Sequence, residues 1–142
     1  MMRRQSGMVL LTLAAGVSLG AVAFSHDEKN EVKRKVVSSK DITEKIDGKE
    51  AKATVVEVTL EPGQEGMPHR HAGPVFGYVL EGEYEHAINE EPAKVLKTGE
   101  TFYEPGGCLH RVSKNPGKVK ARILATIIHP RDAKEITIPE KK

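Results

Sequence analysis

The sequence predicts an all-β protein built as a sandwich or barrel, and three observations support this fold class. Short runs rich in β-branched and aromatic residues recur between residues 53 and 128. Glycine and proline separate these runs, since 15 of the chain's 21 Gly and Pro residues lie between Glu61 and Gly117. No apolar pattern with the helical period of about 3.6 residues extends over the chain after residue 23. Closely spaced breakers between short β-rich runs are typical of sandwiches and barrels.

The chain opens with a segment typical of a secretory signal peptide. Arg3 and Arg4 supply its positive start, and a neutral apolar stretch rich in Leu, Ala and Val runs from Met8 to Val22. Ala21-Val22-Ala23 provides the small residues of a cleavage site. We therefore expect residues 1–23 to be removed and the protein to be exported, to the periplasm or outside the cell. The alternative is an uncleaved membrane anchor, which the shortness of the apolar stretch disfavours.

The composition limits the classes of function. A chain of 142 residues is long enough for one compact domain. It has 22 basic and 20 acidic residues, and loss of Arg3 and Arg4 with the signal would leave a protein with no net charge. A neutral protein has no electrostatic reason to bind nucleic acid or anionic lipid, so we expect a small-molecule partner and no membrane contact after cleavage. A single cysteine, Cys108, excludes an internal disulfide and a CxxC site.

The exported chain divides into three parts. Residues 24–50 form a polar segment with room for a first strand, and their basic run Lys33-Arg34-Lys35 is expected to be a solvated leader or the edge of that strand. Residues 51–130 are expected to form the barrel. Residues 131–142 form a polar tail, in which Ile136 and Ile138 could add one edge strand. Exposed edge strands of a small barrel also offer a means of forming a homodimer.

Five runs are expected to be strands of the barrel. Ala53–Leu60 is rich in β-branched residues and alternates, which predicts a half-buried strand. Val75–Leu80 predicts a second strand, on which Tyr84–Ile88 can pair back. Thr101–Glu104 predicts a short strand that ends at a Pro-Gly-Gly turn. Ala121–Ile128 is nearly continuously apolar, as expected of a buried strand.

Two histidine-bearing segments carry the chemistry. His69 and His71 are two residues apart, and on an extended chain this spacing points both imidazoles to one face. His110 follows the turn Pro105-Gly106-Gly107, and a sheet folded on itself can bring it opposite the pair. Imidazole is a good ligand for Zn, Cu, Fe and Ni, so the pattern predicts a metal site of three histidines. The alternative is a polar pocket in which these histidines only form hydrogen bonds.

These segments resemble the two sequence motifs of the cupin superfamily. The first family motif is G-x5-H-x-H-x3,4-E-x6-G, and four residues match it in order and spacing: Gly63, His69, His71 and Gly82. The second is G-x5-P-x-G-x2-H-x3-N, and four residues match it: Gly99, Pro105, Gly107 and His110. The resemblance implies a small double-stranded β-helix, that is, a jelly-roll barrel, with a metal at its mouth.

The sequence departs from the family pattern at two positions. The glutamate of the first motif would fall at Val75 or Phe76, and neither side chain can bind a metal. The asparagine of the second motif comes one residue late, at Asn115. What the resemblance leaves is a site of three histidines. Some cupins hold Fe(II) with a similar arrangement, as the β-diketone and thiol dioxygenases do, whereas others have lost the metal.

Three neutral ligands leave the full positive charge on a bound ion, which favours an anionic, chelating ligand. Three protein ligands also leave open coordination positions, which is typical of catalytic sites. We therefore expect a dioxygenase-like oxidoreductase with Fe(II) that acts on a small chelating substrate; Zn, Mn, Ni and Cu are the other candidate ions. One alternative is a non-catalytic module that binds an organic anion or a sugar. Another is a Zn- or Mn-dependent isomerase or hydrolase, with Glu104 as its acid–base residue.

Other residues near the motifs are weaker candidates. Glu104, Tyr78 and Tyr103 could orient an imidazole by hydrogen bonding, although Glu104 could also be solvated. Phe76 and Tyr78 share a strand face and are expected to lie in the core. Cys108 is expected to be a small buried side chain. The remaining residues are expected to point away from the site or to have no role in it: Arg70, Arg111, His26, His86 and His129.

Overall fold

In the computed structural model the described residues are 31–141, and they form strands and turns with no helix. The predicted all-β class is therefore confirmed. The predicted signal peptide and His26 lie outside the described residues. No helix with the length and apolar character of a membrane span occurs within residues 31–141.

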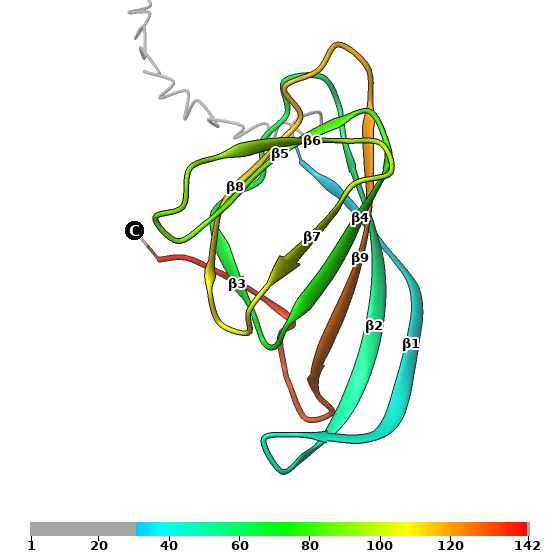
Figure 1. Cartoon of the computed structure of the whole chain (residues 1–142). Helices are drawn as coiled ribbons and strands as arrows, with labels where there is room; N and C mark the ends of the chain where they lie inside the picture. Colours follow the sequence, from blue (N-terminus) through cyan, green and yellow to red (C-terminus); the bar gives the residue numbers. More distant parts are fainter. Residues whose placement is uncertain (1–30, 142) are drawn as a thin grey trace, which may run out of the picture.

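Ten strands make up two antiparallel sheets that face each other (Figure 1). They are β1 (Lys33–Ile46), β2 (Lys49–Leu60), β3 (His69–His71), β4 (Val75–Glu81), β5 (Glu83–Ile88), β6 (Lys94–Lys97), β7 (Thr101–Glu104), β8 (Leu109–Lys114), β9 (Ala121–Pro130) and β10 (Thr137–Pro139). One sheet has the order β1-β2-β9-β4-β7 and the other the order β10-β3-β8-β5-β6. The core lies between the two sheets, and the strands that carry the predicted histidine ligands, β3 and β8, are neighbours in the second sheet.

The centre of the first sheet is the pair of strands β2 and β9. They are paired from Ala51 opposite Pro130 to Leu60 opposite Ala121, so the strands predicted over residues 53–60 and 121–128 are both present. β9 is buried at alternate positions rather than continuously, because only one of its faces is turned toward the second sheet. Its inner residues pack with those of β2 and close the core.

One predicted pairing is wrong. β5, which contains Tyr84–Ile88, does not pair back on β4 but lies in the other sheet, between β6 and β8. A single residue, Gly82, joins β4 to β5 with φ of 76°, and a Cβ at this position would lie 2.6 Å from the carbonyl oxygen of Lys120. Glycine tolerates this conformation and this close approach, so the chain turns a corner from one sheet into the next instead of forming a hairpin.

The two faces of β4 were assigned incorrectly from the sequence. Phe76 and Tyr78 share a face, but their side chains are 53% and 43% exposed, so they are not core residues. The inner face of β4 consists of Val75, Gly77 and Val79, all of which are buried. Alternation gives a strand two faces, and only the packing of the second sheet decides which face is the inner one.

Both terminal segments add strands to the barrel. β1 has 14 residues, begins at the basic run Lys33-Arg34-Lys35, and pairs along β2 as an edge strand. Its hairpin with β2 extends beyond the rest of the barrel (Figure 1). At the other end of the chain, the edge strand expected from Ile136 and Ile138 is present as β10, which pairs with β3. The polar C-terminal segment therefore reaches β3, the strand that carries two of the predicted ligands.

Candidate metal centre

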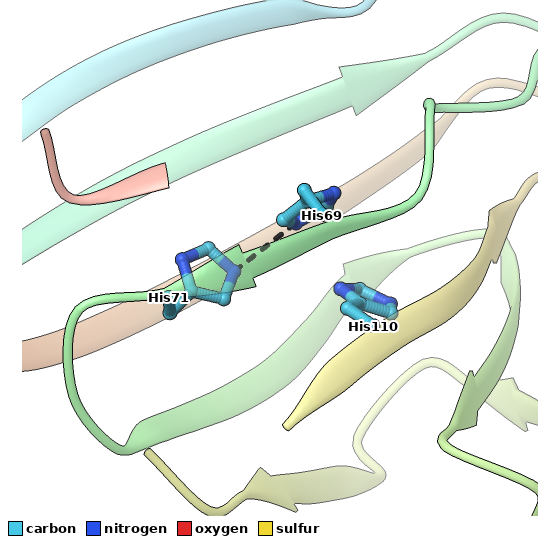
Figure 2. Close-up of side chains that lie close together, drawn as sticks. All are labelled: His69, His71 and His110. Carbon is cyan, nitrogen blue, oxygen red and sulfur yellow. Dashed lines mark hydrogen bonds between the residues drawn. The ribbon is translucent and has the colours of Figure 1, made fainter. Parts of the chain in front are cut away.

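The structure brings the three predicted histidines together. His69 lies directly opposite His110 in the pairing of β3 with β8, and residues opposite each other in a sheet place their side chains on one face. His71 follows two residues later and returns to the same face. The ring centroid of His69 lies 4.8 Å from that of His71 and 4.8 Å from that of His110. Figure 2 shows the rings of His69 and His71 on one strand, with the ring of His110 beside them on another.

The rings of His69 and His71 are oriented by main-chain carbonyl groups. Nδ1 of His69 donates to the oxygen of Met67 over 2.7 Å, and Nδ1 of His71 donates to the oxygen of Ile136 over 3.0 Å. A carbonyl oxygen can only accept, so in each neutral ring the hydrogen is on Nδ1 and Nε2 carries a lone pair. The two Nε2 atoms are 3.1 Å apart (Figure 2), so two acceptors face each other and need a shared cation or proton.

His110 supplies a third nitrogen acceptor that lacks a hydrogen donor. The hydroxyl of Tyr84 donates to Ser113 Oγ over 3.0 Å, which leaves its oxygen free to accept from His110 Nε2 at 3.2 Å. The other ring nitrogen, Nδ1, is buried and has no hydrogen-bond partner among the described residues. It lies 3.2 Å from Oε1 of Glu104, which is also an acceptor when ionised.

Glu104 supplies a carboxylate to this cluster. It is 1% exposed, so it points into the barrel and is not solvated. His86 donates from Nε2 to its Oε1 over 3.2 Å, while Oε2 is buried, lies 3.8 Å from Nε2 of His71, and has no hydrogen-bond partner among residues 31–141. The described residues thus leave one carboxylate oxygen and one nitrogen of each of the three histidines facing a common space.

The position of Glu104 accounts for the missing glutamate of the first motif. In the pairing of β4 with β7, Glu104 lies directly opposite Val75, one of the two positions where that glutamate was expected. Both residues are buried on the inner face, and side chains directly opposite each other are roughly 4.5–5.5 Å apart at Cβ. A carboxylate therefore reaches the same region of the barrel from the neighbouring strand.

Burial disfavours protonation of the most enclosed imidazoles. Desolvation lowers the pKa of His110 to about 3, and it also lowers the pKa of His69. Burial by itself would raise the pKa of Glu104, but the hydrogen bond from His86, helped by His110 and His71, outweighs it, and the pKa of Glu104 lies below its ordinary value. Desolvation thus favours neutral rings at His69 and His110, whereas the contacts of Glu104 favour its ionised form, and a buried anion requires a cation.

A cavity of about 50 Å³ lies beside the cluster. Its polar side is made by the cluster, and its opposite walls are apolar, with Val58, Phe102 and Ile127 among them. Gly77 helps to shape it, because a Cβ at this position would overlap the ring of Phe102. One water position needs roughly 10–15 Å³ of such volume, so the cavity has room for only about four water-sized groups.

Sequence reasoning missed two residues that contact the cluster, Tyr84 and His86. Both lie on β5, two residues apart, and the pairing of β5 with β8 brings them to His110 and Glu104. Their spacing is the same as that of His69 and His71, and this was the available signal. It was not used because His86 lies outside the two histidine motifs.

Other candidate residues lie away from the cluster. Tyr78 and Tyr103 are exposed on the outer face of the first sheet and do not orient an imidazole. Arg70 and Arg111 point away, as expected; Arg111 donates to two loop carbonyl groups. Asn115 is completely buried, and its amide donates to two main-chain carbonyl groups, so its role is structural.

Residues 131–141, here called the C-terminal strap, contact β3 along its free edge, where β10 pairs with it. Within the strap, Thr137 pairs with His71 in the register of β10 and β3, and the carbonyl of Ile136 orients the His71 ring. Arg70 forms two charge-assisted hydrogen bonds of 3.0 and 3.2 Å with the carboxylate of Glu140. The strap therefore positions one of the candidate ligands.

The described residues fit a divalent metal ion. Three imidazole nitrogens and a carboxylate oxygen lack a hydrogen donor, and the three histidines offer ligand atoms within 4.8 Å of one another. Glu104 and His110 also form a second such group with His86. Nitrogen donors with one carboxylate suit Zn, Fe(II) and Mn. The carbonyl and hydroxyl partners of the rings are the contacts that fix the tautomer of metal-binding histidines.

Comparisons with known proteins agree with this fold. A structure of oxalate oxidase with the substrate analogue glycolate is 26% identical over 56% of this chain, with a TM-score of 0.51; the match covers only 43% of the oxidase. An uncharacterised double-stranded β-helix protein from Klebsiella pneumoniae is 24% identical over 80% of this chain and 88% of its own, with a TM-score of 0.60. A cupin domain from Bordetella pertussis is 20% identical over 68% and 92%, with a TM-score of 0.50.

No curated protein sequence matches the chain. The double-stranded β-helix neighbours confirm the predicted jelly-roll fold. The family described as the cupin domain matches residues 56–127, which is half of the 142-residue sequence. This chain is therefore a member of the cupin family.

Proposed function

We propose that this cupin holds one divalent metal ion with His69, His71, His110 and Glu104 and oxidises a small organic acid with dioxygen. One observation carries the proposal: acceptor atoms without hydrogen donors converge from both sheets on one buried cavity. Fe(II) and Mn(II) suit this mixed set of imidazole and carboxylate donors. When bound, such an ion supplies positive charge and open positions for a chelating substrate and for dioxygen.

The chain's own residues prepare the site. The carbonyls of Met67 and Ile136 fix two rings so that their Nε2 atoms face the cavity. The hydrogen bond from His86 holds Oε1 of Glu104 and leaves Oε2 directed toward His71. The apolar walls limit the water around the cluster, which strengthens the interaction of the site with a charged ligand.

The size of the cavity supports a small substrate. A space with room for about four water-sized groups favours a very small acid, part of which lies at the cavity mouth, over large aromatic chelators. The likeness to an oxalate oxidase with bound glycolate supports the same class, although this chain spans less than half of that protein. A chelating carboxylate also suits the positive charge of the proposed metal.

The test combines metal analysis with oxygen uptake. The protein is loaded anaerobically with Fe(II) or Mn(II), its metal content is measured, and oxygen consumption is followed with oxalate, glycolate, short diketones and thiols. We expect about one metal per chain and oxygen uptake with at least one small acid. Bound metal with no uptake for any of these compounds would contradict the oxidase proposal, and absence of bound metal would contradict the site itself.

The inward position of Glu104 favours a second candidate, a Zn- or Mn-dependent isomerase or hydrolase in which Glu104 is the acid–base residue. Metal affinity and turnover of a Glu104→Gln variant distinguish this candidate from the oxidase. If Glu104 binds the metal, the variant loses metal affinity. If Glu104 transfers protons, the variant keeps its metal and loses turnover only.

We also propose that the protein acts outside the cytoplasm, on the basis of the signal-like segment in residues 1–23. Amino-terminal sequencing of the protein recovered from the exported fraction tests this. A start at or near residue 24 is expected, and a cytoplasmic protein that begins at Met1 would contradict it.

A further inference from the structure

Arg34 lies on β1, outside the residues that match the cupin family. In the pairing of β1 with β2 it lies directly opposite Val58, which lines the cavity. Side chains directly opposite each other share a face of the sheet, so Arg34 is on the inner face. Val32, two residues earlier on the same face, is 7% exposed and belongs to the core, which anchors the start of β1.

The Arg34 side chain lies at the mouth of the cavity. It lines both the inner cavity and a larger, more open recess outside it, and His69 and Thr137 are the other residues common to the two. Arg34 is itself exposed, so solvent and ligands can reach it. Among the residues that line the inner cavity, it is the only Lys or Arg.

The guanidinium of Arg34 has no acidic partner within residues 31–141. Within the described residues, Nη1 of Arg34 donates a hydrogen bond of 3.3 Å to the carbonyl of Val32. By contrast, Arg70, Arg122 and Arg131 each pair with a carboxylate. Glu31 and Glu65 also line the outer recess, but neither forms an ion pair with Arg34. Most of the five N–H donors of Arg34 are therefore available to a ligand.

We propose that Arg34 binds the carboxylate of the substrate at the cavity mouth, while a second oxygen of the same molecule reaches the histidine cluster. The inference rests on the proposed function and specifies its substrate class: small carboxylates with an adjacent oxygen donor, such as short 2-hydroxy acids, 2-oxo acids and dicarboxylates. A planar guanidinium matches a carboxylate with two parallel hydrogen bonds. Neutral sugars lack the charge that this cation recognises.

The test measures binding of glycolate, oxalate, acetate and inorganic phosphate by calorimetry to the manganese-loaded full protein, with metal content measured on each sample. The variants are Arg34→Gln, Arg34→Lys and Lys35→Gln. Lys35→Gln is the matched control, because it removes the same charge from the next residue, which faces outward opposite Glu57. We expect Arg34→Gln to weaken glycolate binding by about 10- to 100-fold, Arg34→Lys to weaken it less, and Lys35→Gln to leave it within about twofold.

The outcomes separate this inference from the proposed function. Full metal content with glycolate affinity unchanged in Arg34→Gln overturns the role of Arg34 and leaves the metal site standing. If the protein binds no metal but still binds glycolate in a way that depends on Arg34, the role of Arg34 is supported and the metal site is overturned. An equal loss in Lys35→Gln, or an Arg34 effect on phosphate and not on glycolate or oxalate, overturns the inference. Binding of neither metal nor acid overturns both.

Discussion

The two sides of the cavity are held in different ways. On the side of β3, main-chain carbonyl groups orient the rings of His69 and His71. On the side of β7, Glu104 is held by other side chains, chiefly His86. Main-chain contacts depend on the register of the strands, whereas side-chain contacts depend on which residues face inward. The comparison suggests that the histidine side is rigidly placed, and that the carboxylate can be supplied from more than one inner position.

The largest effect is expected when the histidine side is removed. In a His69→Ala/His71→Ala variant two of the nitrogen donors are lost, so metal content should fall from about one to below about 0.1 per chain. Elemental analysis measures this. Glu91→Gln, a change in an exposed loop, serves as a control for purification and handling. Retention of metal by the double variant would show that the ion binds elsewhere.

A smaller but more specific effect is expected at the carboxylate. Glu104→Val should weaken metal affinity by roughly 100-fold, because it removes the anionic ligand but leaves three imidazoles. The double variant Val75→Glu/Glu104→Val returns a carboxylate to the directly opposite position, and it should recover at least part of the lost affinity. Metal titration of the three proteins tests this. Equal metal affinity in the single and double variants would contradict the idea that a carboxylate at position 75 can replace the one at position 104.

The C-terminal strap offers a test of the main-chain contacts on the histidine side. Deletion of residues 136–142 removes the carbonyl that orients His71, and metal affinity should fall by roughly 10- to 100-fold. Glu140→Gln removes only the exposed ion pair with Arg70 and should change metal affinity and stability little, because solvent screens such a pair. Metal titration of both variants, with melting temperatures as a folding control, distinguishes them. A folded deletion variant with unchanged affinity would show that the strap does not position His71.

The smallest expected effect is the pH dependence of the metal-free protein. Burial holds the pKa of His110 at about 3, whereas an unfolded chain has a histidine pKa of about 6.5. Between these values only the unfolded state binds the proton. The free energy of unfolding is therefore highest, with respect to His110, above pH 6.5, and it decreases as the pH is lowered from 6.5. Calorimetry with chelator present should give a melting temperature lower by roughly 5 °C at pH 5 than at pH 7.5. An unchanged melting temperature would contradict the neutral, buried state of His110.

The sequence predicted the parts of this protein that local spacing determines. His69 and His71 share a face because they are two apart on a strand, and His110 is identified by its Pro-x-Gly turn. The all-β class and the main strands of the first sheet follow from short β-rich runs between glycines and prolines. These features need no knowledge of which strands are neighbours.

What the sequence did not predict depends on pairing between distant strands. Glu104 was a candidate acid–base residue, but its position opposite Val75 as a possible metal ligand depends on the register of β7 with β4. His86 reaches the site because the chain changes sheet at Gly82. Arg34 lies on β1, whose place at the edge of the first sheet was one of two expectations, but its position opposite Val58 depends on the register of β1 with β2. Such registers are set by the packing of whole sheets, which a local pattern does not specify.

Anomalous diffraction from a crystal of the protein with one equivalent of zinc locates the metal directly. We expect a single peak inside the barrel, about 2.0–2.2 Å from one nitrogen each of His69, His71 and His110 and from Oε2 of Glu104. A peak that touches only surface residues, or no peak between the two sheets, would contradict a metal centre in this cavity.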